Sequence, residues 1–564
     1  MGNDEQRGKS FFSDPGFWGF IHRSFTKSMG YTNEDLQKPV IGICNTHSEL
    51  NKCHANFNEL ADYVKRGVWQ AGGLPLEFPT ISLGEPYVKP TTMLLRNLAA
   101  MDTEEMIKAH QIDGVVLLGG CDKTIPAQLM AAASANVPSI VLTGGPMLNG
   151  RYDNADVGAC TDCYRFHLEH KAGNISNDEI MEIEDAFCRS DGHCNVMGTA
   201  STMASIAEAL GMTLPGCASI PAVDSRRKHI AEKTGKQIVE VVKKQLKPRD
   251  IMTKEAIENA ICVTMASGGS TNAIIHLIAI AGRLGIALSL RTFEEISENT
   301  PFLLNLKPSG DYLMEEYFEA GGVPALLSVL KPLLHTNCLT VTGHTVSENI
   351  NEAKVLRTDV ITSLENPIEG RGGIAVLNGN ISPRGALIKQ TAVTDRLKKH
   401  RGAAVVFDSL DDMYARIDDE GLKVDENSVL ILRNVGPKGA PGMPEVGQIP
   451  IPQKLLEKGV RDMVRISDGR ISGTSYGTLI VHVTPEAAEG GPLAIIKDGD
   501  EIELDIVKKL LHLHLSDQEI NQRLKEWKQP DYHYERGYGL LFERSVLQAD
   551  QGCDFDFLIP KEVR

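Results

Sequence analysis

Three cysteines lie in stretches of sequence whose neighbouring residues suggest chemistry rather than core packing. Cys121 stands in Gly-Gly-Cys-Asp-Lys-Thr at 119–124, Cys194 in Gly-His-Cys-Asn at 192–195, and Cys53 in Asn-Lys-Cys-His at 51–54. Thiolates bind zinc and iron–sulfur clusters, and a helix N-terminus or a nearby lysine such as Lys123 favours the thiolate form. Because the three are far apart in sequence, spacing alone leaves open a shared metal site or separate buried thiols.

The one Cys-x-x-Cys pair, Cys160 and Cys163, is a weaker signal. Zinc and ferredoxin-type sites usually use further paired cysteines, and no second pair lies near this one. We therefore expect these two residues to be ordinary core or surface thiols. The chain has eleven cysteines and no apolar signal segment, which predicts reduced thiols in a cytoplasmic protein.

A predicted parallel sheet would position these loops. Short apolar runs at 39–44, 114–118 and 139–142 are typical of strands buried on both faces, with helical segments between them. Cys53 follows the first run and Cys121 the second, and in such sheets sites form beyond the carboxyl ends of strands. We expect residues 1–365 to form an α/β domain with a parallel sheet.

The pattern changes near residue 366. Strand-like runs recur at 374–377, 403–407, 429–432 and 479–483, separated by turns rich in glycine and proline. Frequent short strands of this kind predict a β-rich, barrel-like C-terminal domain over residues 366–564. A late helix is expected to begin at Ser516, which forms a capping box with Glu519.

The composition excludes several classes of protein. Of 564 residues, 42% are hydrophobic and 23% are charged, and the formal net charge is −16. An acidic surface disfavours nucleic acid and anionic membranes, and we expect the most basic run, at 398–401, to be a solvated helix end. No stretch of 18 consecutive apolar residues is present, so no membrane span is expected.

Four longer motifs make the sequence recognisable. They are Gly-Cys-Asp-Lys-Thr at 120–124 with Pro126, Gly-Gly-Ser-Thr-Asn at 268–272, Gly-Pro-Lys-Gly-Ala-Pro-Gly-Met-Pro-Glu at 436–445, and Ser-Asp-Gly-Arg-Ile-Ser-Gly-Thr at 467–474. In these motifs and their order the chain resembles the dihydroxy-acid dehydratase family, which includes phosphogluconate and sugar-acid (aldonate) dehydratases. The resemblance runs over residues 13–558, nearly the whole chain.

The resemblance implies a metal-dependent active site. Cys53, Cys121 and Cys194 would hold an iron–sulfur cluster, [2Fe–2S] or alternatively [4Fe–4S], while Glu85, Asp122, Lys123 and Glu445 would bind Mg²⁺. Ser472 and Lys123 would be catalytic, with Ser472 as the base and Lys123 carboxylated in some relatives. Thr199, Ser270, Thr474 and His193 are candidates for substrate contacts. Without the resemblance, Asp122 would be interpreted as a helix cap, the glutamates as solvated charges and Ser472 as a turn residue.

These groups suit the dehydration of a 2,3-dihydroxy acid, in which C2 loses a proton and C3 loses hydroxide. Three thiolates leave one iron with an open position for the C3 hydroxyl. Carboxylate oxygens suit Mg²⁺, which would hold the acid's carboxylate and C2 hydroxyl. Ser472 would need Mg²⁺ and backbone N–H groups of the 473–474 turn nearby, because a free serine is a very weak acid.

Within the family, the sugar-acid branch is the nearest match. Glu-Phe-Pro at 77–79 followed by Glu85, and the run at 192–195, are similar to that branch, and Arg384 replaces an acidic residue common in the amino-acid-pathway enzymes. We expect a hydro-lyase acting on an aldonic acid. A branched-chain dihydroxy-acid dehydratase is the alternative, and a non-catalytic iron–sulfur carrier is the rival from another class. The resemblance also implies a homodimer or homotetramer.

Overall fold

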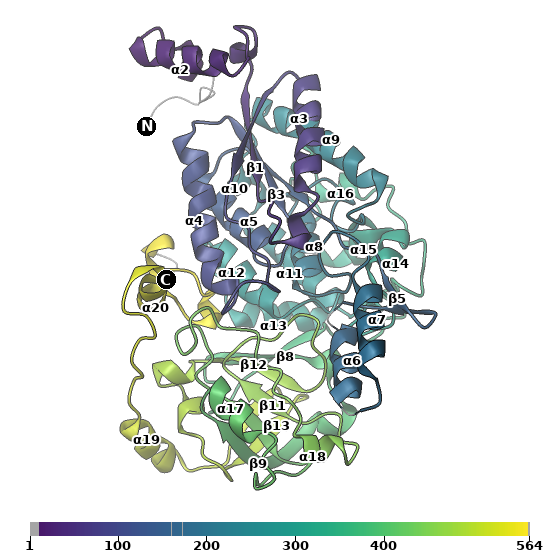
Figure 1. The fold of residues 1–564 in the computed structure, drawn as a ribbon, viewed down its shortest axis with the longest axis vertical. Helices are drawn as coiled ribbons and strands as arrows, with labels where there is room; N and C mark the ends of the chain where they lie inside the picture. The colour runs from purple at the N-terminus through teal and green to yellow at the C-terminus, as the bar shows by residue number, and fades with distance from the viewer. Residues whose placement is uncertain (1–10, 160, 172, 562–564) are drawn as a thin grey trace.

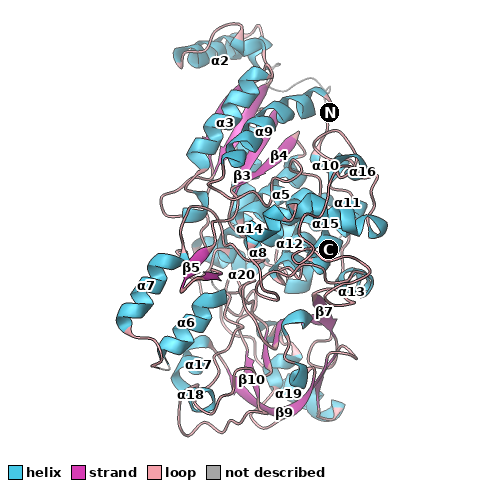
Figure 2. Cartoon of the chain, turned by 90° about the vertical axis from the view of Figure 1, so that its right-hand side faces the viewer, coloured by secondary structure: helices cyan, strands magenta, loops and turns pink. Residues whose placement is uncertain are grey.

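The computed structural model describes residues 11–159, 161–171 and 173–561, and these form two large sheets of different kinds. Figure 1 shows the first sheet in the upper part of the molecule and the second at its lower end. In Figure 2 most helices gather around the first sheet and the middle of the molecule. No helix among the described residues is long and apolar enough to cross a membrane.

The first sheet is parallel, as predicted, and has the strand order β2-β1-β3-β4. Its strands are β1 (Val40–Asn45), β2 (Leu74–Pro79), β3 (Gly114–Gly119) and β4 (Ser139–Thr143). Every residue of β1, β3 and β4 is buried, which explains why these strands are continuous apolar runs in the sequence. The edge strand β2 has partly exposed side chains and was not predicted.

The strand order creates a place where loops can meet. From β1 the chain moves outward to β2 on one side, and from β3 it moves outward to β4 on the other. Ligand sites in open parallel sheets form beyond the carboxyl ends of the two strands at such a point. The loops that leave β1 and β3 there carry Cys53 and Cys121.

Four helices cover this sheet. Helices α3 (Phe57–Gln70) and α9 (Ser225–Lys243) pack together on one side, and α4 (Met93–Ala109) and α5 (Thr124–Ala135) lie on the other (Figure 1). Glycines bring α3 and α9 unusually close: a Cβ atom on Gly67 would lie 2.0 Å from the carbonyl oxygen of Glu232. This contact fixes α3, and with it the loop before α3 that carries Cys53.

Three buried helices connect the sheet to the rest of the molecule. They are α8 (Thr199–Ala209), α11 (Lys254–Ala266) and α12 (Asn272–Leu284), and they pack against one another and, for α8 and α12, against α5. Helix α12 is buried along almost its whole length, and most of its residues are apolar. The N-termini of α8 and α12 carry Thr199 and Ser270–Asn272.

The other N-terminal elements are shorter or peripheral. They are α2 (Phe17–Ser28), α6 (Thr161–Lys171), α7 (Asn177–Phe187), α10 (Pro248–Ile251), α13 (Leu290–Asn299), α14 (Met314–Glu319), α15 (Gly322–Leu330), α16 (Val346–Asn349), and the strands β5 (Gly150–Tyr152) and β6 (Ala155–Val157).

The second sheet has eight strands in the order β14-β13-β9-β10-β11-β12-β8-β7. These are β7 (Ile374–Leu377), β8 (Gly385–Lys389), β9 (Lys399–Phe407), β10 (Val429–Leu432), β11 (Arg465–Ser467), β12 (Leu479–Thr484), β13 (Glu501–Asp505) and β14 (Leu510–Leu513). A bridge between Asn378 and Leu510 links the two ends, so the sheet is nearly closed. The predicted β-rich, barrel-like part is therefore confirmed, while the boundary at 365/366 stays a prediction.

Helices α17 (Leu410–Arg416), α18 (Gln453–Leu456), α19 (Asp517–Glu526) and α20 (Gly537–Ser545) complete the C-terminal part. Ser516 is confirmed as the N-cap of α19, since its hydroxyl accepts a hydrogen bond from the Glu519 N–H at 3.2 Å.

One local prediction is wrong: Lys399, His400 and Arg401 belong to strand β9 and not to a helix end. Arg401 stands opposite Glu503 in the ladder with β13 and forms ion pairs with Glu503 (2.7 Å) and Glu501 (3.1 Å). Cross-strand pairing thus neutralises Arg401, a contact between distant residues that the local sequence does not reveal.

Of the pair Cys160 and Cys163, the structure describes only Cys163. Cys160 lies outside the described residues, and Cys163 is exposed on α6.

Candidate active site

Three carboxylates from separate parts of the chain meet at the amine of Lys123. Its Nζ atom lies 3.3 Å from Glu85 Oε2 and 3.4 Å from Glu445 Oε1, and it also pairs with Asp122. Lys123 is fully buried. Glu85 follows β2, Asp122 follows β3 and Glu445 follows β10, so the loops of both sheets supply this cluster.

Asp122 does not cap the following helix: Lys123 is the N-cap of α5, and no side chain there accepts a capping hydrogen bond. The alternative interpretation of Asp122 as a helix cap is therefore wrong. Its carboxylate faces the Lys123 amine instead, and the Cys121 thiol lies 3.5 Å from Asp122 Oδ1.

Glu85 is held by the start of helix α4. Its Oε1 accepts from the Thr91 hydroxyl at 2.8 Å, and its Oε2 accepts from the Thr92 N–H at 3.2 Å and from the Thr92 hydroxyl. A carboxylate at a helix N-terminus is stabilised by the unpaired N–H groups there.

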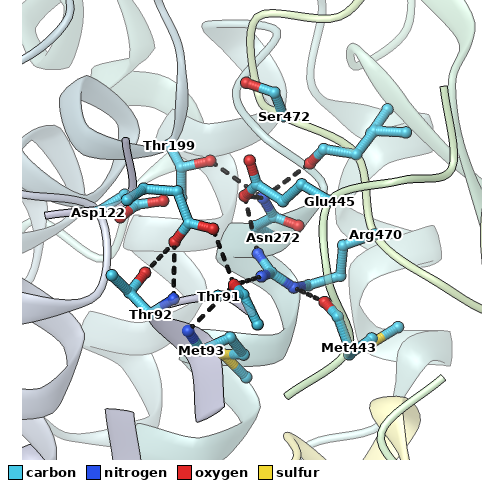
Figure 3. A network of polar contacts seen from close by, with 12 residues as sticks. Thr91, Thr92, Met93, Asp122, Thr199, Asn272, Met443, Glu445, Arg470 and Ser472 are labelled. Atoms are coloured by element: carbon cyan, nitrogen blue, oxygen red, sulfur yellow. Dashed lines mark hydrogen bonds and ion pairs between the residues drawn. The ribbon is translucent and has the colours of Figure 1, made fainter. Parts of the chain in front are cut away.

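Arg470 is a second buried cation in the same place (Figure 3). Its guanidinium donates to Glu445 Oε1 at 2.8 Å, to the Met443 carbonyl at 2.7 Å and to the Thr91 hydroxyl at 3.1 Å. Arg470 therefore ties the Glu445 loop of the barrel to the start of α4, across the junction of the two sheets.

Opposing charges set the protonation of the cluster. Burial alone would raise the pKa of Glu85, but the positive charges of Lys123 and Arg470 outweigh it and lower that pKa to about 2. Burial and the Arg470 charge work against the Lys123 ammonium, yet the three carboxylates raise the pKa of Lys123 above its usual value. For Glu445, burial prevails and its pKa is raised.

The thiols of Cys53 and Cys121 share a buried space. A hydrogen bond from Cys53, followed by burial, raises the pKa of Cys121 well above its usual value. The backbone N–H of Cys121 donates to His54 Nε2 at 3.1 Å, which fixes the two loops to each other. The raised pKa keeps the Cys121 thiol protonated, so a bound cation would be needed to hold it as a thiolate.

The loop of Cys194 lies against that of Cys53. The Gly192 N–H donates to the Lys52 carbonyl at 3.4 Å, and the thiols of Cys194 and Cys53 both contribute to the raised pKa of Cys188, after burial. The loops that carry the three predicted cluster cysteines are therefore neighbours.

His193 lies beside the cysteines with its Nδ1 at 3.0 Å from the Cys194 carbonyl. Its buried Nε2 has no hydrogen-bond partner among the described residues. Burial lowers the pKa of His193 to about 4, so the ring is neutral and Nε2 is free to accept a hydrogen bond. No polar contact of this ring to Glu445, Ser472 or the Lys123 amine occurs within the described part of the chain.

Hydroxyl groups form the other side of the site. Ser472 Oγ lies 2.7 Å from Thr474 Oγ1, and Thr199 Oγ1 lies 2.8 Å from Ser270 Oγ. Gly473 joins the two pairs: a Cβ atom there would lie 2.6 Å from the Thr199 nitrogen, so only glycine lets these segments approach.

Asn272 connects the hydroxyl groups to the carboxylates (Figure 3). Its Nδ2 donates to Glu445 Oε1 at 2.9 Å, to the Ile471 carbonyl at 2.9 Å and to Thr199 Oγ1 at 3.2 Å. The predicted Mg²⁺ ligands and the predicted site residues with hydroxyl groups therefore belong to one connected region. Their individual roles stay predictions.

Two family models together match most of the chain. The model described as "Dihydroxy-acid/6-phosphogluconate dehydratase N-terminal" matches residues 38–349, and its C-terminal counterpart matches residues 359–553. The chain belongs to this dehydratase family. It is therefore a hydro-lyase, and the family resemblance seen in the four motifs is confirmed.

Relatives of this dehydratase match over nearly their whole length. It is 52% identical to the L-arabinonate dehydratase of Rhizobium leguminosarum bv. trifolii, over 95% of this chain and 93% of that protein. It is 46% identical to the 6-deoxy-6-sulfo-D-gluconate dehydratase of Pseudomonas putida (98% and 96%) and 42% identical to the dihydroxy-acid dehydratase of Acetivibrio thermocellus (94% and 97%).

Sequence reasoning missed two residues of the dehydratase's site, Arg470 and Asn272. Both stand inside the recognised motifs, at 467–474 and 268–272, but neither was predicted to contact Glu445. The sequence offered one signal for Arg470, namely that a charged residue stands between a glycine and an apolar residue within the motif. Its partners Glu445 and Thr91 are too distant in sequence to be inferred.

The donor atoms fit the metals that the family implies, with one condition. Three carboxylates offer the hard oxygen atoms that Mg²⁺ prefers, and three thiols offer ligands for iron. As the side chains stand, however, no three Cys, His, Asp or Glu residues in the described ranges are arranged to hold a metal ion. The Lys123 ammonium fills the space between the carboxylates, so Mg²⁺ fits there only when Lys123 is no longer a cation.

Proposed function

We propose that this dehydratase converts a sugar (aldonic) acid into its 2-keto-3-deoxy acid. The observation that carries the proposal is the hydroxyl and amide wall formed by Thr199, Ser270, Asn272 and Thr474 beside Glu445. A polyol chain needs several hydrogen-bond partners, whereas the methyl branches of a dihydroxy-3-methyl acid need an apolar pocket. The higher identity to the two sugar-acid dehydratases than to the dihydroxy-acid dehydratase supports the same substrate class.

Under this proposal the cofactors have assigned residues. Cys53, Cys121 and Cys194 would hold an iron–sulfur cluster, [2Fe–2S] in preference to [4Fe–4S]. Glu85, Asp122, Glu445 and a carboxylated Lys123 would hold Mg²⁺. When bound, these groups supply a Lewis acid for the C3 oxygen and positive charge for the carboxylate and C2 oxygen. Carboxylation would replace the Lys123 ammonium by an anionic oxygen donor. The positive charge that now lies between the three carboxylates would then be gone.

Ser472 would take the proton from C2. Thr474 supports its oxygen with the hydroxyl at 2.7 Å and the backbone N–H at 3.4 Å. Ser472 would accept the proton as its alkoxide. As the C2–H bond breaks, its electron pair forms the C2–C3 double bond and the C3–O bond breaks; Ser472 would then give the proton to the departing hydroxide, which leaves as water and restores the alkoxide. The enol that remains then tautomerises to the 2-keto-3-deoxy acid.

Arg470 and Asn272 would act by positioning Glu445. Both donate to the same oxygen, Oε1, which fixes the direction of the carboxylate. Thr199 and Ser270 would bind substrate hydroxyls, and His193 Nε2 would accept a hydrogen bond from the same chain of hydroxyls.

Turnover of a substrate set tests the proposal. We expect kcat/KM for pentonates or hexonates to exceed that for 2,3-dihydroxyisovalerate by about tenfold or more, because unsatisfied polar groups in the wall penalise the branched acid. Formation of the 2-keto-3-deoxy acid is followed directly. Equal or faster turnover of dihydroxyisovalerate would contradict the choice of substrate class, and reversible reduction without any turnover would favour an electron carrier.

We also propose that the enzyme is a homodimer or homotetramer. Helix α2 projects from the body of the molecule in Figure 1, and its Phe17, Trp18, Phe20 and Phe25 side chains are 60–68% exposed. Four large exposed aromatic side chains on one helix favour burial against another protein surface. Light scattering after size exclusion should give the mass of two or four chains, and a monomer would contradict the proposal.

A further inference from the structure

Lys389 is a buried lysine whose amine has no hydrogen-bond partner among the described residues. The residue is only 5% exposed. Lysine is rarely buried without a counter-charge, because removing an ammonium from water is costly. Burial lowers the pKa of Lys389 to about 7, and no charged side chain in the described part of the chain counters this effect. Packing alone therefore does not explain why the Lys389 amine is buried here.

Lys389 lies on the face of the barrel that meets the N-terminal half. In β8, Ala386 and Ile388 belong to the apolar core of the barrel, whereas Leu387 packs in the core of the N-terminal half. Because side chains alternate along a strand, Lys389 shares the face of Leu387. Its ladder partner, Ile374, belongs to the same N-terminal core.

On one side, the chain next to Lys389 contacts the segment that leads to Ser270. Gln390 Nε2 donates to the Gly372 carbonyl at 2.5 Å. The next residue, Gly373, touches Gly268, since a Cβ atom on Gly373 would lie 2.5 Å from the Gly268 Cα. Gly268 begins the Gly-Gly-Ser-Thr-Asn motif at 268–272.

On the other side, the same stretch contacts the segment that carries Ser472 and Thr474. The Gly477 N–H donates to the Ala392 carbonyl at 3.2 Å, so residues 389–392 lie along the end of the 472–477 turn. The end of β8 that carries Lys389 thus lies between the two segments that supply the proposed substrate contacts.

We infer that Lys389 binds the far end of the substrate chain, by donating to a terminal hydroxyl oxygen or by pairing with a terminal acid oxygen. The inference rests on the proposed function, which assigns the acid's carboxylate and C2 oxygen to the carboxylate cluster around Lys123. The Lys389 amine makes no hydrogen bond to any member of that cluster among the described residues. The amine would therefore meet the opposite end of a five- or six-carbon acid, whose oxygen would replace the water lost on burial.

The test uses Lys389→Met with substrates that have or lack a distal oxygen. Methionine keeps the length and apolar stem of lysine and removes the donor. Thr213→Val is the matched control, because Thr213 is also buried with an oxygen that has no partner among the described residues, yet it follows α8 away from the site. kcat/KM is measured for a pentonate and for 2,3-dihydroxybutanoate, whose fourth carbon carries no oxygen.

We expect Lys389→Met to lower kcat/KM for the pentonate about tenfold to a hundredfold, the range for one hydrogen bond from a charged donor. The value for 2,3-dihydroxybutanoate should change by less than about twofold. Thr213→Val should leave both values unchanged. Equal losses on the two substrates, or no loss on either, would overturn the inference.

The wild-type enzyme provides a second measurement in case Lys389→Met does not fold. Only the ammonium form offers a full charge, so the KM for the pentonate should rise, relative to that for 2,3-dihydroxybutanoate, as the pH increases above about 7. A ratio that stays constant from about pH 6 to about pH 9 would overturn the inference. If no aldonate is dehydrated, the proposed function fails; if aldonates are dehydrated without these effects, only the role of Lys389 fails.

Discussion

Replacing Arg470 with lysine should loosen Glu445 while the positive charge is kept. The three nitrogens of the Arg470 side chain serve three partners: Glu445 Oε1 at 2.8 Å, the Met443 carbonyl at 2.7 Å and the Thr91 hydroxyl at 3.1 Å. One amine cannot reach all the partners of a planar fork, so lysine should keep one contact and lose two. At ~1–1.5 kcal/mol for each buried hydrogen bond, the free energy of unfolding should fall by ~2–3 kcal/mol.

Urea unfolding measures this loss, and kcat/KM with a pentonate measures the effect on Glu445. We expect kcat/KM to fall about tenfold or more, because a misplaced catalytic group costs up to ~100-fold. Arg433→Lys is the matched control: Arg433 donates to the carbonyls of Leu493, Ala494 and Ile496, pairs with Asp408, and contacts no predicted site residue.

The control should lose similar stability and keep kcat/KM within about twofold of the wild type. If Arg470→Lys lowers kcat/KM no more than Arg433→Lys at equal stability, Arg470 does not position Glu445 and the reasoning is refuted.

Three further predictions concern the base, the metal and a buried acid. Ser472→Ala should lower turnover by about a hundredfold to ten-thousandfold while the visible absorption of the iron–sulfur cluster stays unchanged; full turnover would exclude Ser472 as the base. Glu445→Gln should raise the Mg²⁺ concentration for half-maximal activity of chelator-treated enzyme about tenfold or more, and an unchanged requirement would refute its role as a ligand. Burial raises the pKa of Glu208 to about 7, so this carboxyl keeps a proton in the folded state that the unfolded chain releases. As the pH rises from about 4.5 to about 7, the free energy of unfolding of the wild type should therefore fall relative to that of Glu208→Gln; urea unfolding at several pH values would show a constant difference if this is wrong.

The sequence predicted those parts of the fold that depend on local patterns. Strands β1, β3 and β4 are buried on both faces, so each is an uninterrupted apolar run that the sequence displays directly. The C-terminal strands are short and separated by glycine and proline, which predicts a barrel-like part. The closing bridge between Asn378 and Leu510 depends on residues that are distant in sequence, and no local pattern reveals it.

The candidate site was predictable to a similar degree. Cys53 and Cys121 follow strands that lie side by side, so the predicted sheet already indicated that their loops could meet. The predicted roles of Glu85 and Glu445 came from family motifs, since a single glutamate carries no local signal of ligation. Arg470 and Asn272 were missed because their contacts with Glu445 form only in the folded chain. Arg470 meets Glu445 between two loops of the barrel part, and Asn272 meets it where the barrel packs against α12.

Iron and sulfide content after anaerobic reconstitution of single cysteine variants tests the central claim most directly. Cys53, Cys121 and Cys194, from three separate loops, are proposed to hold one cluster. Replacing any of them with serine should leave less than about half of the wild-type iron, which is about two atoms per chain for [2Fe–2S] or about four for [4Fe–4S]. Cys188→Ser is the matched control, since the Cys188 thiol lies within electrostatic reach of Cys53 and Cys194 and should not be a ligand. Full iron content in any of the three variants, or loss of iron in Cys188→Ser, would contradict the account.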